Sequence, residues 1–219
     1  MEQYYGILKK TELFSGIAEA ELPSLLACLS AKTAHYRKGA AVFMSGDAIT
    51  GFGLVLSGQV QIYQEDYFGN RSILGHAGPG ELFGESFACA ETKELPVSVA
   101  ASAESELLFI DCRRLASPCA NACSFHSRLI RNLMNTIAKK NIALTRKIEF
   151  TSGRTTREKL LAYLSSEALK AKSSRFFIPF DRQGLADYLS VDRSALSSEL
   201  GKLRNEGVLN FRKNSFELM

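Results

Sequence analysis

Three cysteines and one histidine lie within fifteen residues of one another: Cys112, Cys119, Cys123 and His126. The last three are spaced four and then three residues apart, so they share one face if a helix starts near Ser117-Pro118. Thiolate and imidazole ligands suit zinc or an iron–sulfur cluster, whereas a pair of thiols suits a redox switch. The alternative is that the cysteines are small buried apolar residues and that His126 is exposed at a helix start.

A second group of side chains near the C-terminus has the pattern of a DNA-binding motif. Asp181 and Asp192 are good N-cap residues, and they predict helices over 182–189 and 193–206. A tight turn at 190–191 separates the two helices, which together form a helix-turn-helix. In such a motif the N-terminal residues of the second helix reach base edges in the major groove.

The candidate DNA contacts follow from this placement. Arg193 is suited to a two-hydrogen-bond contact with guanine or to a phosphate contact, and the serines after it allow close approach. Residues 208–218 then predict a β-hairpin with a basic tip that reaches the DNA backbone, as in a winged helix. The residues expected to contact DNA are Arg182, Arg193, Ser194, Ser197, Ser198, Lys202, Arg212 and Lys213.

The distribution of charge agrees with an anionic partner at this end. The chain has 219 residues and a net charge of +4. Residues 1–150 carry 15 Lys and Arg against 15 Asp and Glu, whereas residues 151–219 carry 12 against 8. Such asymmetry indicates nucleic acid or membrane at the basic end. No apolar run is long enough to span a membrane and no signal peptide is evident. Because the five cysteines are odd in number, we expect a reducing, cytoplasmic location.

A long helix predicted over about 124–150 carries a heptad pattern. An unbroken spacing of 3.5 residues is typical of a two-stranded coiled coil, and Asn141 favours a parallel dimer with fixed register. The alternative is that this face packs on the β-roll of its own chain. Leu129 and Leu133, which lie off the pattern, are also placed to pack against the roll. The residues expected in the dimer interface are Ile130, Met134, Ile137, Asn141, Leu144 and Ile148.

The segment before this helix predicts a different architecture. Residues 6–31 suggest two short helices, and ten of the 16 glycines fall between Gly39 and Gly84. Short apolar segments between turn signals predict an antiparallel β-roll of about eight strands. The fold class is therefore α+β. It comprises an N-terminal jelly-roll, or double-stranded β-helix, with the long helix (1–150), followed by a C-terminal winged helix-turn-helix domain (151–219).

Over nearly its full length the sequence resembles the CRP/FNR family of bacterial transcription regulators. The matching segments are Gly39, Ser45-Gly46-Asp47, 56–60, 80–85 and 182–194. The resemblance implies a cytoplasmic homodimer that binds a pseudo-palindromic operator in double-stranded DNA, with RNA polymerase as a further partner. It also implies an effector site between the roll and the long helix, so that the roll acts as an allosteric sensor.

The sequence departs from the cyclic-nucleotide-binding members at one point. Those members carry Gly-Glu and, some ten residues on, Arg-Ser, which hold the ribose and the cyclic phosphate. Here Gly84-Glu85 is present, but Leu95-Pro96 stands in place of Arg-Ser. Burying a phosphate without a paired cation costs on the order of several kcal/mol, because the ion loses its hydration. We therefore expect that cAMP and cGMP do not bind tightly and that Gly84-Glu85 is an inherited turn. A non-standard phosphate site is the alternative.

The effector itself stays unidentified: a small molecule, a metal or an iron–sulfur cluster are the alternatives. The N-terminal cysteine cluster of the iron–sulfur members is absent. The candidate effector pocket comprises Gly84, Glu85, Cys89, Leu95, Pro96, Lys140 and Asn141. Effector binding, or a change in cysteine state, would bias the packing of the long helix and reorient a hinge near 151–153.

Two other classes of function were weighed against a DNA-binding regulator. A cupin-like β-barrel enzyme needs several histidines and a carboxylate around a metal, but His35, His76 and His126 lie in separate segments. No serine-hydrolase, P-loop or Rossmann pattern is present either, so the sequence does not indicate an enzyme. A module that acts only through protein contacts is the remaining alternative, and an operator-binding assay distinguishes it.

Overall fold

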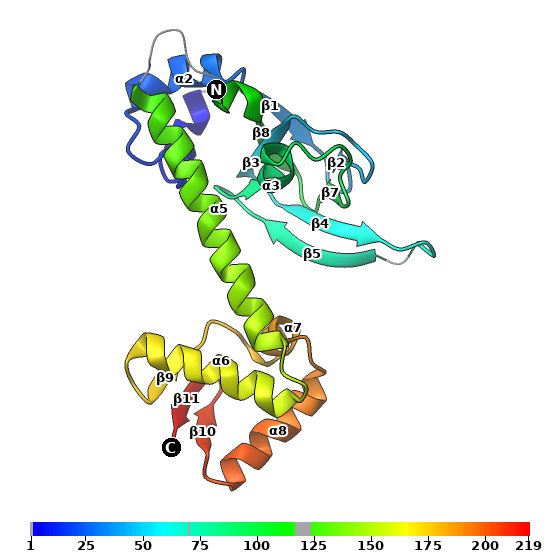
Figure 1. The fold of residues 1–219 in the computed structure, drawn as a ribbon, viewed down its shortest axis with the longest axis vertical. Coiled ribbons are helices and arrows are strands. Elements are labelled where there is room, and N and C mark those ends of the chain that lie inside the picture. Colours follow the sequence, from blue (N-terminus) through cyan, green and yellow to red (C-terminus); the bar gives the residue numbers. More distant parts are fainter. Residues whose placement is uncertain (1, 70, 117–123) are drawn as a thin grey trace. The chain divides into compact units, whose positions relative to one another are not determined.

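The longest element is helix α5 (Ser124–Thr151), which matches the predicted 124–150 helix to within one residue. The computed structural model describes residues 2–69, 71–116 and 124–219 (Figure 1). Two compact units are formed by Met1–Ala138 and Lys139–Met219, and α5 contributes to both. Cys119, Cys123 and the expected helix start at Ser117-Pro118 lie outside the described residues.

The first unit begins with short helices, as expected for residues 6–31. They are η1 (Glu2–Tyr4), α1 (Tyr5–Leu8), η2 (Glu19–Glu21) and α2 (Leu22–Cys28). Their leucines are fully buried together with Leu129 of α5, and Leu133 lies in the same core. The interpretation that these two residues pack on their own chain is therefore confirmed.

The β-roll follows with the expected number of strands. They are β1 (Lys32–Tyr36), β2 (Ala41–Phe43), β3 (Gly51–Ser57), β4 (Val60–Glu65), β5 (Arg71–Ala77), β6 (Leu82–Phe83), β7 (Ser98–Ala101) and β8 (Ser105–Asp111). One sheet has the order β1-β8-β3-β6 and the other β2-β7-β4-β5. All pairings are antiparallel, which confirms the predicted roll.

Aromatic rings fill the space between the two sheets. Phe43 lies 5.8 Å, centroid to centroid, from both Phe83 and Phe109. The close approach of Phe83 to strand β3 requires glycine at position 53, because a Cβ there would lie 2.0 Å from the Phe83 ring. The interior of the roll is therefore a packed core.

Two short helices of the first unit were not expected from the sequence. Helix α3 (Glu85–Cys89) follows Gly84, whose φ of 77° is in the left-handed region. Helix α4 (Cys112–Ala116) directly follows β8. Helices α3 and α4 contact each other and both contact β3. Each spans five residues, which is too short for an apolar periodicity to be visible.

The second unit contains α6 (Thr156–Ala171), β9 (Arg175–Phe177), α7 (Arg182–Leu189), α8 (Arg193–Asn205), β10 (Leu209–Arg212) and β11 (Ser215–Leu218). The strands form a sheet of order β10-β11-β9, and α6 contacts both β9 and α8 (Figure 1). Leucines from all three helices and Phe150 at the end of α5 form its core. Among the described residues, no helix combines the length and apolar character needed to cross a bilayer.

Candidate nucleic-acid interface

The helix-turn-helix is formed by local hydrogen bonds at both helix starts. Asp181 Oδ1 accepts from the Gly184 amide at 2.7 Å. Asp192 Oδ1 accepts from the amides of Ser194 at 2.8 Å and Ala195 at 3.0 Å. Donation by the Ser194 hydroxyl and by these amides lowers the pKa of Asp192. Both predicted N-caps are present, and they fix where α7 and α8 begin.

Helix α8 has one apolar and one polar face. Leu196, Leu200 and Leu203 are fully buried, whereas Arg193, Ser194, Ser197 and Ser198 are exposed. The Ser197 hydroxyl donates to the Arg193 carbonyl at 2.9 Å. Its donor is thus used within the helix, and Ser194 and Ser198 with Arg193 are the better placed to meet a ligand.

The predicted cationic contacts divide into two groups. Lys202 pairs with Glu199 at 3.5 Å on the same helix. Arg182 is half-buried, and burial lowers its pKa. By contrast, Arg193, Arg212 and Lys213 are exposed, and none of them forms an ion pair with another described residue. These three are the cations that an anionic ligand would meet without displacing an internal partner.

The basic tip of the hairpin is held in place by its neighbours. Lys213 occupies the turn between β10 and β11 with φ 55°. The next residue, Asn214, donates from Nδ2 to the Ile178 carbonyl at 3.2 Å and accepts from the Ile178 amide at 3.0 Å. The turn is therefore anchored to the chain after β9.

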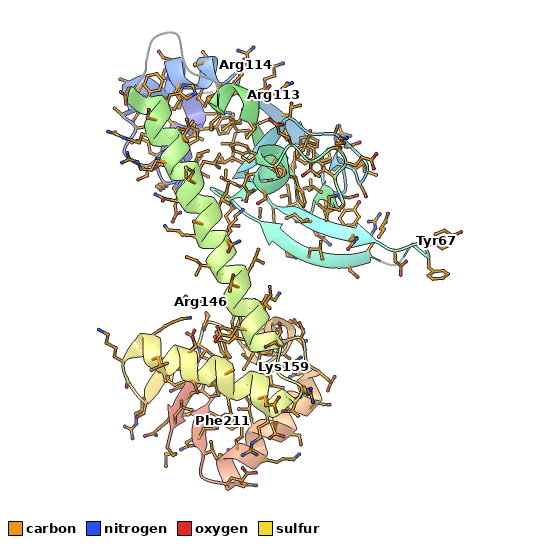
Figure 2. The ribbon with its side chains drawn as sticks, viewed as in Figure 1. Tyr67, Arg113, Arg114, Arg146, Lys159 and Phe211 are labelled. Carbon is orange, nitrogen blue, oxygen red and sulfur yellow. The ribbon has the colours of Figure 1, made fainter. Side chains whose placement is uncertain are left out.

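One part of this surface was missed by sequence reasoning. The guanidinium of Arg182 lies 5.1 Å from the centre of the Phe211 ring, and that of Arg204 lies 5.2 Å from it. Figure 2 labels Phe211, which comes from β10 and so belongs to the hairpin. An aromatic residue beside a basic hairpin tip is a weak sequence signal, and no spacing rule connects it to two helices.

The predicted dimer residues on α5 differ in exposure. Ile130 and Ile137 are partly buried against the core of the first unit. The remaining apolar members are exposed: Met134 (65%), Leu144 (61%) and Ile148 (67%). Asn141 is exposed as well. These exposed members form an apolar stripe along α5 on which a partner could pack.

The candidate effector residues lie in several settings. Leu95 is buried, its amide donates to the Asp47 carbonyl at 2.8 Å, and its carbonyl accepts from the Gly46 amide at 2.8 Å. Pro96 is exposed. Glu85 is buried, next to Gly84 at the start of α3. Lys140 is half-buried and Asn141 exposed on α5. Cys89, which the sequence predicts to line the effector pocket, is exposed at the end of α3 and is not a core residue.

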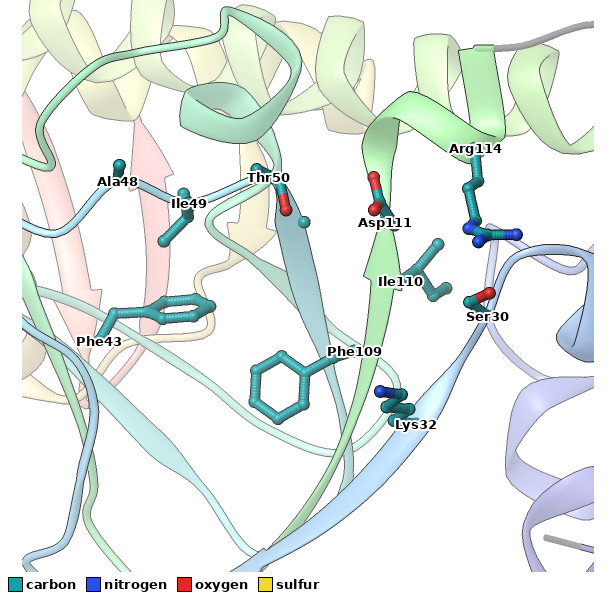
Figure 3. A pocket seen from close by; sticks show the side chains of 11 residues that line it. Ser30, Lys32, Phe43, Ala48, Ile49, Thr50, Phe109, Ile110, Asp111 and Arg114 are labelled. Atoms are coloured by element: carbon teal, nitrogen blue, oxygen red, sulfur yellow. The ribbon is translucent and has the colours of Figure 1, made fainter.

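A cavity of about 530 Å³ opens at one end of the roll (Figure 3). None of the predicted effector residues lines it, and sequence reasoning did not find it because its walls come from distant segments. Lys32 and Arg114 stand on one side of it and the Phe43 and Phe109 rings form part of its floor. The lining residues are Ser30, Lys32, Phe43, Ala48, Ile49, Thr50, Gly51, Phe109, Ile110, Asp111 and Arg114.

The described members of the cysteine and histidine group lie in the core. Cys112 is buried at the start of α4. His126 is buried too, and its Nε2 lies 3.1 Å from the Leu115 carbonyl and 3.2 Å from that of Arg114. The expectation that His126 is exposed is therefore wrong, because the start of α5 packs against α4. Within the described residues, no three His, Cys, Asp or Glu side chains gather as metal ligands.

Comparisons with known proteins show similarity to one kind of regulator. The family model described as the cyclic nucleotide-binding domain matches residues 33–121, the roll. The nitrogen fixation regulation protein FixK of Bradyrhizobium diazoefficiens is 27% identical over 181 residues, which are 80% of this chain and 73% of FixK. The chain is thus similar to CRP/FNR-type regulators in both its sequence and its roll.

A cyclic AMP receptor protein and two solved regulators are also similar to this chain. The cyclic AMP receptor protein of Thermus thermophilus is 33% identical over 101 residues, 46% of this chain and 45% of that protein. The solved global regulator CLP of Xanthomonas campestris has a TM-score of 0.56 at 22% identity, with 92% of this chain and 99% of that chain covered. The Thermus thermophilus catabolite activator protein has a TM-score of 0.50 at 24% identity, covering 95% and 94%. The two structures support the fold.

Proposed function

We propose that this chain is a homodimeric, sequence-specific DNA-binding transcription regulator that acts in the cytoplasm. Each protomer would insert the N-terminal turn of α8 into the major groove and place its hairpin on the neighbouring backbone. Two protomers would bind the two halves of a pseudo-palindromic operator about 34 Å apart. RNA polymerase is the partner through which such a regulator would change transcription.

The observation that carries this proposal is a set of exposed cations on one unit that form no ion pair with any residue described in the structure. Arg193 stands beside the exposed serines of α8, and Arg212 and Lys213 stand at the anchored hairpin tip. The division of charge supports the same assignment. Lys139–Met219 carries 16 Lys and Arg against 9 Asp and Glu, whereas Met1–Ala138 carries 11 against 14. A surface of this kind attracts phosphates.

The roles of Arg193 and Lys213 can be separated by substitution. On a duplex selected by the wild-type chain from a random pool, Arg193→Ala is expected to cost about 1–3 kcal/mol and to relax specificity at one base-pair position. Lys213→Ala is expected to weaken binding to all duplexes and to reduce the slope of log K against log salt by about 0.9. Fluorescence anisotropy at several salt concentrations measures both quantities.

Lys38→Ala is the matched control, because Lys38 is an exposed cation on the first unit. We expect this variant to bind like the wild type. If Arg193→Ala and Lys213→Ala change specificity and salt dependence in the same way, the assigned roles are wrong. If neither changes binding, the module acts through protein contacts.

The effector is proposed to be something other than a cyclic nucleotide. The support is local: the buried Leu95 and the exposed Pro96 supply neither a cation nor a hydroxyl where the phosphate would lie. The hydrogen bonds between Leu95 and the 46–47 turn also hold this segment in place. A calorimetric titration that shows micromolar affinity for cAMP would contradict this part of the proposal.

A further inference from the structure

Two cysteines that are far apart in the sequence lie together in the first unit. Cys89 Sγ, at the end of α3, lies 2.9 Å from Cys112 Sγ, at the start of α4. Both are free thiols. A disulfide bond is about 2.05 Å long, so the two sulfurs need to approach by less than 1 Å to bond.

The elements that carry the two sulfurs are anchored in one core. Ala88, next to Cys89, and Leu115, on the same helix as Cys112, belong to the same buried cluster. The Cys112 amide also donates to the Thr50 carbonyl at 2.9 Å. Core packing therefore holds the sulfurs close together, and little chain entropy remains to be lost when they bond.

We propose that Cys89 and Cys112 are a reversible dithiol–disulfide pair, oxidised by hydrogen peroxide. Cys89 is exposed and reachable by the oxidant, whereas Cys112 is buried and reachable by Cys89. This assignment goes beyond the DNA-binding function and does not depend on it. It also differs from a site built on Cys119 and Cys123, because it uses neither.

The chemistry proceeds in two steps that balance. The proton between the sulfurs moves to Cys112, and the Cys89 thiolate attacks one oxygen of the peroxide. The O–O bond breaks, Cys89 becomes a sulfenic acid, and the hydroxide released takes up a proton to form water. The Cys112 sulfur then attacks the Cys89 sulfur, the S–O bond breaks, and a second water leaves with the Cys112 proton. Two thiols and one peroxide become one disulfide and two waters.

The hydrogen bond between the two sulfurs shifts their pKa values in opposite directions. Donation from Cys89 lowers the pKa of Cys112, against burial and the carboxylates of Asp111 and Glu91, which raise it. The same hydrogen bond, together with burial, raises the pKa of Cys89. The hydrogen bond thus favours the thiolate on Cys112 and the proton on Cys89. Because thiolate is the form that reacts with oxidants, this proton must pass to Cys112 before the exposed Cys89 attacks the peroxide.

Tryptic mapping of the oxidised chain tests the pair directly. Lys93 and Arg113 place Cys89 and Cys112 in adjacent peptides, 72–93 and 94–113, with one cysteine each. After brief treatment of the native chain with hydrogen peroxide, we expect these two peptides to be joined in most molecules. The mass of the joined peptides should equal the sum of the two reduced peptide masses minus two hydrogens. Dithiothreitol should separate the peptides again.

Two controls make the outcome decisive. A chain with Cys28, Cys119 and Cys123 replaced by serine is expected to form the same cross-link at an unchanged rate. The wild-type chain oxidised in urea should form it several-fold less, because the proximity is then lost. The Cys89→Ser variant should keep Cys112 reduced. If the native chain leaves the two peptides separate, or joins them no better than the urea-treated chain, the pair is refuted.

Discussion

At the scale of single residues, equal charges have different roles in the DNA-binding unit. The guanidinium groups of Arg182 and Arg204 lie 5.1 and 5.2 Å from the centre of the Phe211 ring, whereas Arg193 is exposed and unpaired among the described residues. A guanidinium over an aromatic face contributes about 0.5–1 kcal/mol at a partly exposed site. We therefore expect the first two arginines to stabilise the unit and Arg193 to serve recognition.

Replacing the ring isolates this contribution. Phe211→Leu keeps an apolar side chain but removes both arginine contacts, and it is expected to destabilise the unit by about 1–2 kcal/mol. Phe177→Leu is the matched control, because Phe177 is 75% exposed on the same sheet. Urea unfolding followed by far-UV circular dichroism measures both. If the two variants lose the same free energy of unfolding, the arginine contacts are not the cause of the loss.

The N-cap Asp192 predicts a dependence on pH. Its pKa is lowered in the folded chain by the Ser194 hydroxyl and two backbone amides. The stabilisation is therefore present above the ordinary aspartate pKa, about 3.9, and is lost as the pH falls through the lowered folded-state value. Asp192→Asn keeps a capping oxygen without the titration. Unfolding curves from pH 7 to pH 2 should show a smaller acid-dependent loss in this variant, and parallel profiles would contradict the prediction.

At the scale of elements, the core of the roll requires a glycine in β3. A Cβ at position 53 would lie 2.0 Å from the Phe83 ring, so Gly53→Ala forces that ring out of the aromatic core. Overpacking of this kind costs about 1–3 kcal/mol. Gly75→Ala is the matched control on β5, where a Cβ would have nothing within 4 Å. Thermal melts should separate the two variants, and Gly53→Ala with Phe83→Leu should recover part of the loss.

Elements set by neighbouring residues were predictable, and contacts between distant residues were not. Asp181 and Asp192 act within three residues, so the starts of α7 and α8 follow from the sequence. Helices α3 and α4 have too few turns to show a period. The contact of Cys89 with Cys112, and that of Phe211 with two arginines, arise only when separate strands and helices pack. The sequence therefore predicts candidate DNA contacts. It does not show which of these side chains already contact other groups of the protein.

At the scale of the whole molecule, the exposed stripe on α5 predicts self-association. Leu144→Lys with Ile148→Lys places charges where a second α5 would pack, at positions that are 61% and 67% exposed in the single chain. Burying one such side chain is worth about 1.5–3 kcal/mol, so dimer affinity should fall by at least about tenfold. Sedimentation velocity across a concentration series measures the loss, and operator affinity should fall with it.

Ile142→Lys provides the control for this prediction. Ile142 lies on the same helix and is 54% exposed, but it is outside the heptad pattern. We expect this variant to remain dimeric. A wild-type chain that stays monomeric with and without DNA would remove the basis for a two-fold operator.

The Phe211 ring links the hairpin to both helices of the helix-turn-helix. Arg182 is the first residue of α7, Arg204 lies near the end of α8, and both contact the strand that leads to Lys213, so we expect the hairpin tip to keep its position relative to α8. If α8 contacts bases and the hairpin tip contacts phosphates, as proposed, the distance between these two sets of contacts is fixed by the protein. Inserting one base pair between the bases and the phosphates that these elements would contact should therefore lower the affinity for DNA, because the two elements keep their spacing.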